Sequence, residues 1–252
     1  MSRAFVYGVV PAKAEPRVNV DGLGGRPVRT VARGELAAIV SDLGDDKVPG
    51  RREDLDAHAA VLADAIRSGT VVPMRFGVSL ENDKAVQERL LGRNEARLQE
   101  LLRALEGHVQ ATLKAFYLED ALLRQIVRSN EEIARLREAT RGREDASTQG
   151  LRVRLGQLVA DAVETQRAVD QRELLSKLEP LVTDMRVEQP AHERVALHVQ
   201  MLVRRDRATQ LEAAAEELAR LHEERLRFRY VAPLAPFSFS EIPLEAEEPA
   251  WA

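Results

Sequence analysis

The chain is 252 residues long, with 31% charged residues, 4% aromatic residues and a formal net charge of −4. Its length allows one large or two ordinary domains, and we expect two. The charged share exceeds the roughly 25% of an average soluble domain, which favours long solvated helices over a β-sandwich. Basic and acidic residues are interleaved, so neither nucleic acid nor an anionic membrane surface is an expected partner.

Cysteine is absent, which excludes disulfides, a thiolate nucleophile and a cysteine-based metal site. The first residues lack the long apolar core of a signal peptide. No stretch of about 18 apolar residues occurs, so no transmembrane helix is predicted. Together these features favour a cytoplasmic protein.

The first part of the chain predicts the element order β-β-β-α-β-α. Apolar and β-branched runs predict strands at residues 4–10, 28–31 and 36–40. Helical spacing predicts a first helix whose apolar positions are Leu55, Ala59, Leu62 and Ile66. A second helix is predicted from Leu98, Leu101, Leu102 and Leu105, with Asn82 as a plausible N-cap before it.

Between these helices lies an apolar segment that holds a proline and an arginine. It reads VVPMRFG and consists of Val71, Val72, Pro73, Met74, Arg75, Phe76 and Gly77. We expect a buried central strand whose alternation places Val72, Met74 and Phe76 on the core face. Arg75 then lies on the opposite side, and a structural ion pair is the favoured interpretation of its charge.

The second part of the chain predicts the order β-α-β-β-α-β, which is that of a ferredoxin-like domain. Strands are predicted at residues 109–117, 182–187, 195–203 and 228–231, the middle two forming a hairpin. A long helical region follows the first of these strands, with breaks near residues 141–142 and 147–150. A final helix carries Leu211, Ala215 and Leu218 on one side.

The predicted fold class is α+β, with two domains. The first covers residues 1–107 and is an N-terminal α+β domain. The second covers residues 108–252 and is ferredoxin-like with additional helices. It ends in a proline-rich, acidic tail, which we expect to cover a surface as an irregular segment.

The search for chemistry gives little. The five histidines, His58, His108, His192, His198 and His222, show no metal-ligand spacing, and His58 is interpreted as a packing residue on an apolar helix face. No GxSxG nucleophile motif occurs, and clustered carboxylates are explained as solvated helix faces. We therefore predict no enzyme activity, no metal and no cofactor.

Two further features have ordinary explanations. The glycine cluster at residues 20–25 lacks the spacing of a phosphate-binding loop and is interpreted as a turn. Arg204, Arg205 and Arg207 form a basic group before the last helix. Their position at a helix start could hold an anion, but surface charge is the favoured interpretation.

Three motifs in order along the chain resemble the GvpF/GvpL family of gas vesicle proteins. They are FVYGVV at residues 5–10, VVPMRFG at 71–77 and YVAPLAPFSF at 230–239, and RVRLGQLV at 152–159 is also similar. The chain departs from the family pattern at Ala232 and Ala235, where the family usually has glycine and proline, and at Val78, where it has threonine. The resemblance covers nearly the whole chain.

The resemblance implies a non-enzymatic gas vesicle accessory protein with an α+β domain and a ferredoxin-like domain. Family members are thought to bind the small hydrophobic shell protein GvpA, and this implies a role in preventing its aggregation during vesicle nucleation and growth. Other accessory proteins are possible further partners. Two alternatives stay open: a scaffold that joins several accessory proteins, and a small-molecule sensor built on a ferredoxin-like domain.

Two routes to the shell protein fit the sequence. One is apolar contact through the tail residues Pro233, Leu234, Pro236, Phe237 and Phe239. The other is edge addition, in which a strand of the partner pairs with an open edge of either predicted sheet.

Overall fold

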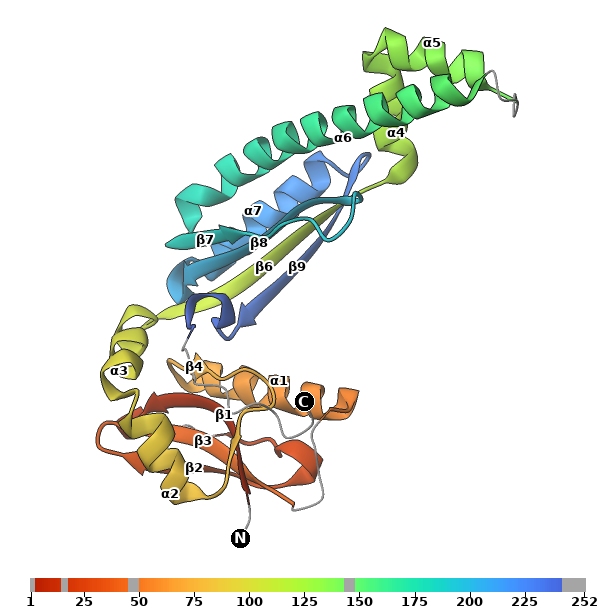
Figure 1. Cartoon of the computed structure of the whole chain (residues 1–252). Coiled ribbons are helices and arrows are strands. Elements are labelled where there is room, and N and C mark those ends of the chain that lie inside the picture. Colours follow the sequence, from red (N-terminus) through yellow and green to blue (C-terminus); the bar gives the residue numbers. More distant parts are fainter. Residues whose placement is uncertain (1–2, 15–17, 45–49, 143–147, 242–252) are drawn as a thin grey trace. The chain divides into compact units, whose positions relative to one another are not determined.

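The computed structural model describes residues 3–14, 18–44, 50–142 and 148–241. The chain forms two compact units, which are coloured along the sequence in Figure 1 and are described separately here. The first unit contains residues 1–111, 202–205 and 232 onward, and the second contains residues 112–201 and 206–231. The sequence predicted a single domain boundary near residue 107. The structure differs because two later segments, residues 202–205 and the described part of the tail, pack with the first unit.

The first unit is built on a sheet with the strand order β2-β3-β1-β4. Its strands are β1 (Arg3–Pro11), β2 (Val28–Arg33), β3 (Leu36–Leu43), β4 (Val72–Pro73) and β5 (Ser79–Leu80), and β5 also pairs with β1. β1 and β3 are antiparallel, with a register irregularity between Val6 and Gly8. The β2–β3 hairpin turns at Gly34, whose φ of 57° suits glycine. The first three predicted strands are confirmed.

The expectation of a central strand at VVPMRFG is wrong. Only Val72 and Pro73 form a strand, β4, and it lies at the end of the sheet, whereas β3 and β1 are the interior strands. The Met74 N–H still donates to the Tyr7 carbonyl at 2.8 Å, and the chain then turns through Gly77, which has a φ of 96°. After the turn, the Val78 carbonyl accepts from the Val6 N–H, so the chain leaves the sheet at residues 75–77 and returns to it at Val78.

Helices cover this sheet. They are α1 (Arg52–Ser68), the single-turn α2 (Asp83–Ala85), the π-helix η3 (Val86–Gly92) and α3 (Glu95–Ala104). The predicted leucine stripe of α3 is buried, and the Asn82 side chain accepts from the Ala85 N–H as an N-cap. The buried face of α1 differs from the prediction. Leu55 is 49% exposed, and the helix packs through His58, Val61, Leu62, Ala65 and Ile66.

The second unit has a four-stranded sheet with the order β7-β8-β6-β9. Its strands are β6 (His108–Tyr117), β7 (Asp184–Val187), β8 (Val195–Arg204) and β9 (Leu226–Leu234). Its helices are α4 (Glu119–Ser129), α5 (Glu131–Thr140), α6 (Gln149–Leu178) and α7 (Ala208–Leu221). Figure 1 shows α6 and α7 side by side along the sheet. The predicted ferredoxin-like order, with additional helices after its first strand, is confirmed. Short 3₁₀ turns lie at Ala12–Ala14, Leu23–Gly25, Glu179–Leu181, Arg205–Arg207 and Phe237–Phe239.

A buried polar group ties α6 to the sheet of the second unit. Asp170 is only 2% exposed, and its carboxylate accepts from the Tyr117 hydroxyl at 2.8 Å and from Arg225 Nη2 at 2.9 Å. Gln166 Nε2 donates to the same carboxylate at 3.0 Å. Burial, and then the nearby carboxylate, raise the pKa of Tyr117. The charge of Asp170 is therefore satisfied from three parts of the unit.

Candidate functional site

The three sequence motifs meet at one cluster of aromatic rings in the first unit. Phe5 and Tyr7 come from β1, His58 from α1, Phe76 from the VVPMRFG segment and Phe237 from the tail. The His58 ring lies 5.5 Å from Tyr7, 5.6 Å from Phe5 and Phe76, and 6.3 Å from Phe237, measured between ring centroids. Most pairs are edge-on or tilted, which is favourable for aromatic rings. The motifs therefore pack against one another.

His58 is the polar centre of this cluster and is 4% exposed. Its Nε2 lies 3.2 Å from the Met74 carbonyl oxygen. Because a carbonyl only accepts, Nε2 carries the proton, and Nδ1 is a bare acceptor with no hydrogen-bond partner in the described structure. Burial lowers the pKa of His58, because it disfavours the charged form of the ring. This geometry agrees with the predicted packing role.

Tyr7 joins the cluster to the glycine-rich turn. Its hydroxyl is 2.7 Å from Ser41 Oγ and accepts from the Leu23 N–H at 2.8 Å. A Cβ on Gly22 would lie 2.2 Å from the same hydroxyl, so glycine is needed for this close approach. Burial raises the pKa of Tyr7. The glycine cluster is thus a turn, as the sequence indicated, and the structure shows that it packs on Tyr7.

The tail residues proposed as a contact surface have different surroundings. Phe239 is 9% exposed and belongs to the apolar core of the first unit, and Pro236 is also buried. The Ser238 N–H donates to Gln110 Oε1 at 3.0 Å, which fixes the tail beside β6. Leu234 is half-buried and Pro233 is exposed. Phe237 is 41% exposed, and within residues 232–241 it is the aromatic side chain that a partner can reach.

Three exposed residues adjoin this cluster, and we call them the Phe237 patch: Phe237 itself, Arg75, which precedes Phe76 in the chain, and Leu55. Leu55 lies one helical turn before His58, on the same side of α1. Arg75 is exposed and makes no side-chain hydrogen bond or ion pair within the part of the chain that the structure describes. The ion pair expected for Arg75 is therefore not found there. The patch combines apolar side chains with an arginine, a composition common at interface centres.

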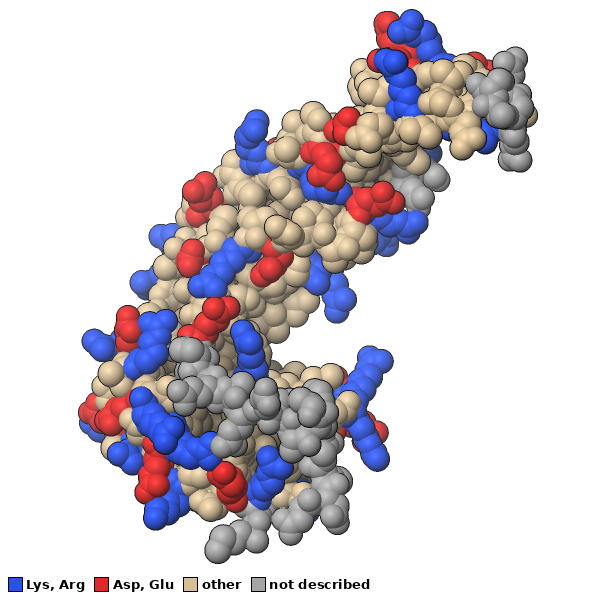
Figure 2. All heavy atoms as spheres, in the orientation of Figure 1, with Lys and Arg blue, Asp and Glu red and all other residues tan. Residues whose placement is uncertain are grey.

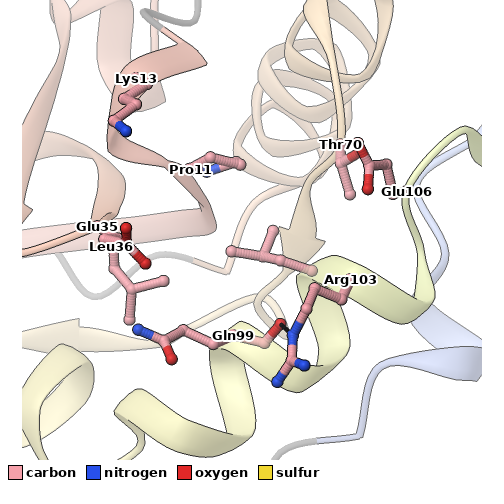
Figure 3. Close-up of a pocket in the computed structure, with 9 residues that line it drawn as sticks. Pro11, Lys13, Glu35, Leu36, Thr70, Gln99, Arg103 and Glu106 are labelled. Carbon is pink, nitrogen blue, oxygen red and sulfur yellow. Dashed lines mark hydrogen bonds between the residues drawn. The ribbon is translucent and has the colours of Figure 1, made fainter.

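A separate shallow pocket of about 290 Å³ lies elsewhere in the first unit (Figure 3). Its walls carry Lys13 and Glu35 from around β1 and β3, Thr70 from the end of α1, and Gln99 and Arg103 from α3. The Arg103 Nε–H donates to the Gln99 carbonyl of its own helix. Pro11, Leu36 and Leu102 also belong to the lining, whose exposed surface is more apolar than polar. The volume lies just below the range of about 300–1,000 Å³ that is typical of ligand pockets, so the pocket gives limited support to a sensor function.

The basic group before α7 has a structural role that the sequence did not indicate. Arg205 Nη2 donates to the carbonyls of Ile66 and Gly69, the latter at 2.9 Å, at the C-terminal end of α1. A cation at this end of a helix satisfies free carbonyls and opposes the helix dipole. Arg205 and Ile66 are separated by 139 positions, so no local pattern links them.

Within the described ranges, no group of three histidine, aspartate or glutamate side chains is placed to hold a metal ion. No helix found there has the length and apolarity needed to cross a membrane. Figure 2 shows lysine and arginine side chains interspersed with aspartate and glutamate over the face in view.

Comparison with known proteins decides the family. The model described as "Gas vesicle synthesis protein GvpL/GvpF" matches residues 3–241. The chain belongs to the GvpL/GvpF family. A "Gas vesicle protein F" from a Streptomyces species is 37% identical over 243 residues, which cover 94% of this chain and 99% of the relative. A protein of the same name from a Nostoc species is 25% identical, covering 96% of this chain and 99% of the relative.

Solved GvpF structures have the same fold. The crystal structure of GvpF from Anabaena gives a TM-score of 0.84 at 24% identity, covering 96% of this chain and 99% of that one. GvpF from Microcystis aeruginosa gives 0.79 at 21% identity, covering 96% and 100%. Membership of this family makes the protein a gas vesicle accessory protein.

Proposed function

We propose that this protein binds the small hydrophobic shell protein GvpA and prevents its aggregation during gas vesicle nucleation and growth. The single observation that supports this most directly is the Phe237 patch. Its exposed phenylalanine packs against the His58 ring, which restricts the side chain, so less conformational entropy is lost when a partner covers it. An unassembled shell subunit with an apolar face aggregates unless such a surface covers it.

Only part of the tail serves this contact. Phe239 and Pro236 are already used in the fold, so Phe237 supplies the aromatic anchor and Leu55 the neighbouring apolar surface. Arg75 adds a guanidinium for a carbonyl or carboxylate of the partner. Deleting the whole tail is a poor test of this proposal, since it removes core residues as well as the contact.

Edge addition has weaker support. The end strands are β2 and β4 in one sheet and β7 and β9 in the other. The Ala32 carbonyl on β2 already accepts from Gln87 Nε2 at 3.0 Å. β9 carries exposed Arg227, Arg229 and Pro233, residue types that discourage pairing at an edge. β4 and β7 are only 2 and 4 residues long.

The experiment dilutes GvpA from denaturant and follows its aggregation by light scattering. We expect the full chain to delay aggregation and Phe237→Ala to weaken the effect, with binding reduced by about 5- to 30-fold, as for truncation of an anchor worth about 1–2 kcal/mol. Leu221→Ala is the matched control, because Leu221 is 61% exposed on α7 of the second unit. No delay with the native chain, or equal loss in both variants, would contradict the proposal.

A further inference from the structure

The sheet of the second unit has one face that α6 and α7 do not cover. Tyr117 contacts Asp170 of α6, so the residues that alternate with it on β6 point to the opposite face. The Thr112 hydroxyl donates to Gln200 Oε1, so the Gln200 side chain of β8 lies on that same opposite face. On β9 the Phe228 ring lies 6.5 Å from His222 at the end of α7. Arg227, Arg229 and Val231 therefore point away from the helices.

This uncovered face is cationic. Lys114 on β6 and Arg227 and Arg229 on β9 lie on it, beside Phe116 and Val231, and we call these five residues the basic sheet face. β8, β6 and β9 are adjacent strands that contain no aspartate or glutamate, although the chain has 41 of them. The carboxylate of Glu188, which follows β7, interacts electrostatically with His198 of β8, as does Lys114.

The three cations of this face have no side-chain hydrogen bond or ion pair within the described ranges. Elsewhere in the unit arginines are paired, as Arg225 is with Asp170 at 2.9 Å and Arg154 with Glu132. Cations on an edge strand such as β9 also serve to prevent pairing with other chains. That explanation does not extend to Lys114, which lies on the central strand β6.

We propose that the basic sheet face binds an acidic, extended segment of a partner protein. Residues two apart on a strand are about 6.7 Å apart and point the same way, so Arg227 and Arg229 match carboxylates two positions apart in an extended peptide. Phe116 and Val231 provide apolar contact beside the charges. Nucleic acid fits less well, because the chain carries a net charge of −4 and the face has a single half-buried aromatic ring.

The test measures fluorescence anisotropy of a short labelled peptide in which glutamate alternates with threonine, titrated with the full chain at low salt. A peptide with glutamine in place of glutamate is the probe control. The variant is Lys114→Gln/Arg227→Gln/Arg229→Gln, which removes three positive charges, keeps polar side chains and leaves the core untouched. The protein control is Arg124→Gln/Arg172→Gln/Arg220→Gln, which removes the same charge from exposed helical positions of the same unit.

We expect the native chain and the helix control to bind the acidic peptide alike, and the sheet-face variant to bind about tenfold more weakly, because exposed charge pairs each contribute little. Binding should also weaken as salt rises to about 0.15 M, where the Debye length is about 8 Å. Absence of binding at low salt, equal loss in both triple variants, or equal binding of the glutamine peptide would overturn the proposal.

Two further measurements distinguish a segment of a partner protein from nucleic acid and from the C-terminal residues of this chain. A single-stranded oligonucleotide that binds more tightly than the peptide, and loses affinity only in the sheet-face variant, would overturn the assignment to a protein segment. Residues 242–252 of this chain contain three glutamates. If deleting them raises peptide affinity in the native chain but not in the sheet-face variant, the acidic segment is the chain's own, and the assignment to a separate partner is overturned.

Discussion

Replacing Gly22 with alanine tests how tightly the glycine-rich turn is packed on Tyr7. Gly22 has φ −81° and ψ −161°, an extended conformation that alanine adopts without backbone strain. Any cost therefore comes from contact. The new Cβ would lie 2.2 Å from the Tyr7 hydroxyl and 3.0 Å from Ser41.

The expected cost is about 3 kcal/mol, the upper end of the range for overpacking a core. The Tyr7 hydroxyl cannot move aside easily, since Ser41 and the Leu23 N–H both hold it. Tyr7→Phe alone should cost about 1–3 kcal/mol, because it leaves the buried Leu23 N–H without an acceptor. In the double variant the methyl group occupies space that the hydroxyl has left. The combined cost should then be about 1–2 kcal/mol less than the sum.

Native-state hydrogen exchange at increasing urea, measured on peptides from β1 and β3, reports the first unit separately from the second. The control is Gly69→Ala, since a Cβ at Gly69 meets no atom within 4 Å. Gly69→Ala should change the free energy of opening little. Strictly additive costs for Gly22→Ala and Tyr7→Phe would refute the reasoning, because the two groups would then not compete for one space.

Three other substitutions test the packing. Burial lowers the pKa of His58 in the folded state, so this residue should not affect the free energy of unfolding above pH 6.5, its ordinary pKa. Below pH 6.5 the free energy of unfolding should fall by up to about 1.4 kcal/mol per pH unit until the folded-state pKa is reached. In urea titrations, His58→Gln should remove this part of the pH dependence, and an unchanged pH dependence would contradict the reasoning. Asp170→Asn should lower the free energy of unfolding by about 3 kcal/mol. This is the lower end of the range for breaking a buried ion pair, because the Arg225 side chain is 27% exposed. A loss under about 1 kcal/mol in thermal unfolding would contradict the view that the buried charge is satisfied by its partners. Phe239→Ala should destabilise the first unit by about 3–5 kcal/mol, whereas Phe237→Ala should cost far less; equal costs by hydrogen exchange would contradict their different burial.

The periodic spacing of apolar residues was sufficient to predict much of the fold. The β2–β3 hairpin and the strand order of the second unit follow from alternation, turn residues and the order of elements, which are local signals. The α3 leucine stripe was also predicted, because Leu98, Leu101 and Leu102 lie at regular helical spacing. Such patterns reveal which residues are apolar together, but not which distant segment covers them.

The failures have that common cause. Leu55 fits the helical spacing of α1 yet is exposed, because it lies in the first turn of that helix, before the first buried residue, His58. VVPMRFG looks like a strand, but Pro73 has no N–H for the ladder and Gly77 allows the turn that ends it. The role of Arg205 and the burial of Phe239 depend on contacts across more than a hundred residues, for which one sequence has no signal.

The convergence of the three motifs changes how the resemblance relates to function. The cluster brings together Phe5, His58, Phe76 and Phe237. Residues that are typical of the family can therefore be explained by their packing on one another, without any contact to a partner. A contact surface must then be sought among side chains that the fold leaves exposed. Phe237 is the one ring of this cluster that is both part of a motif and classed as exposed, at 41%, whereas the basic sheet face lies outside the three motifs except for Val231. Substitutions at the two surfaces should therefore separate binding from folding, which substitutions at the buried motif residues cannot do.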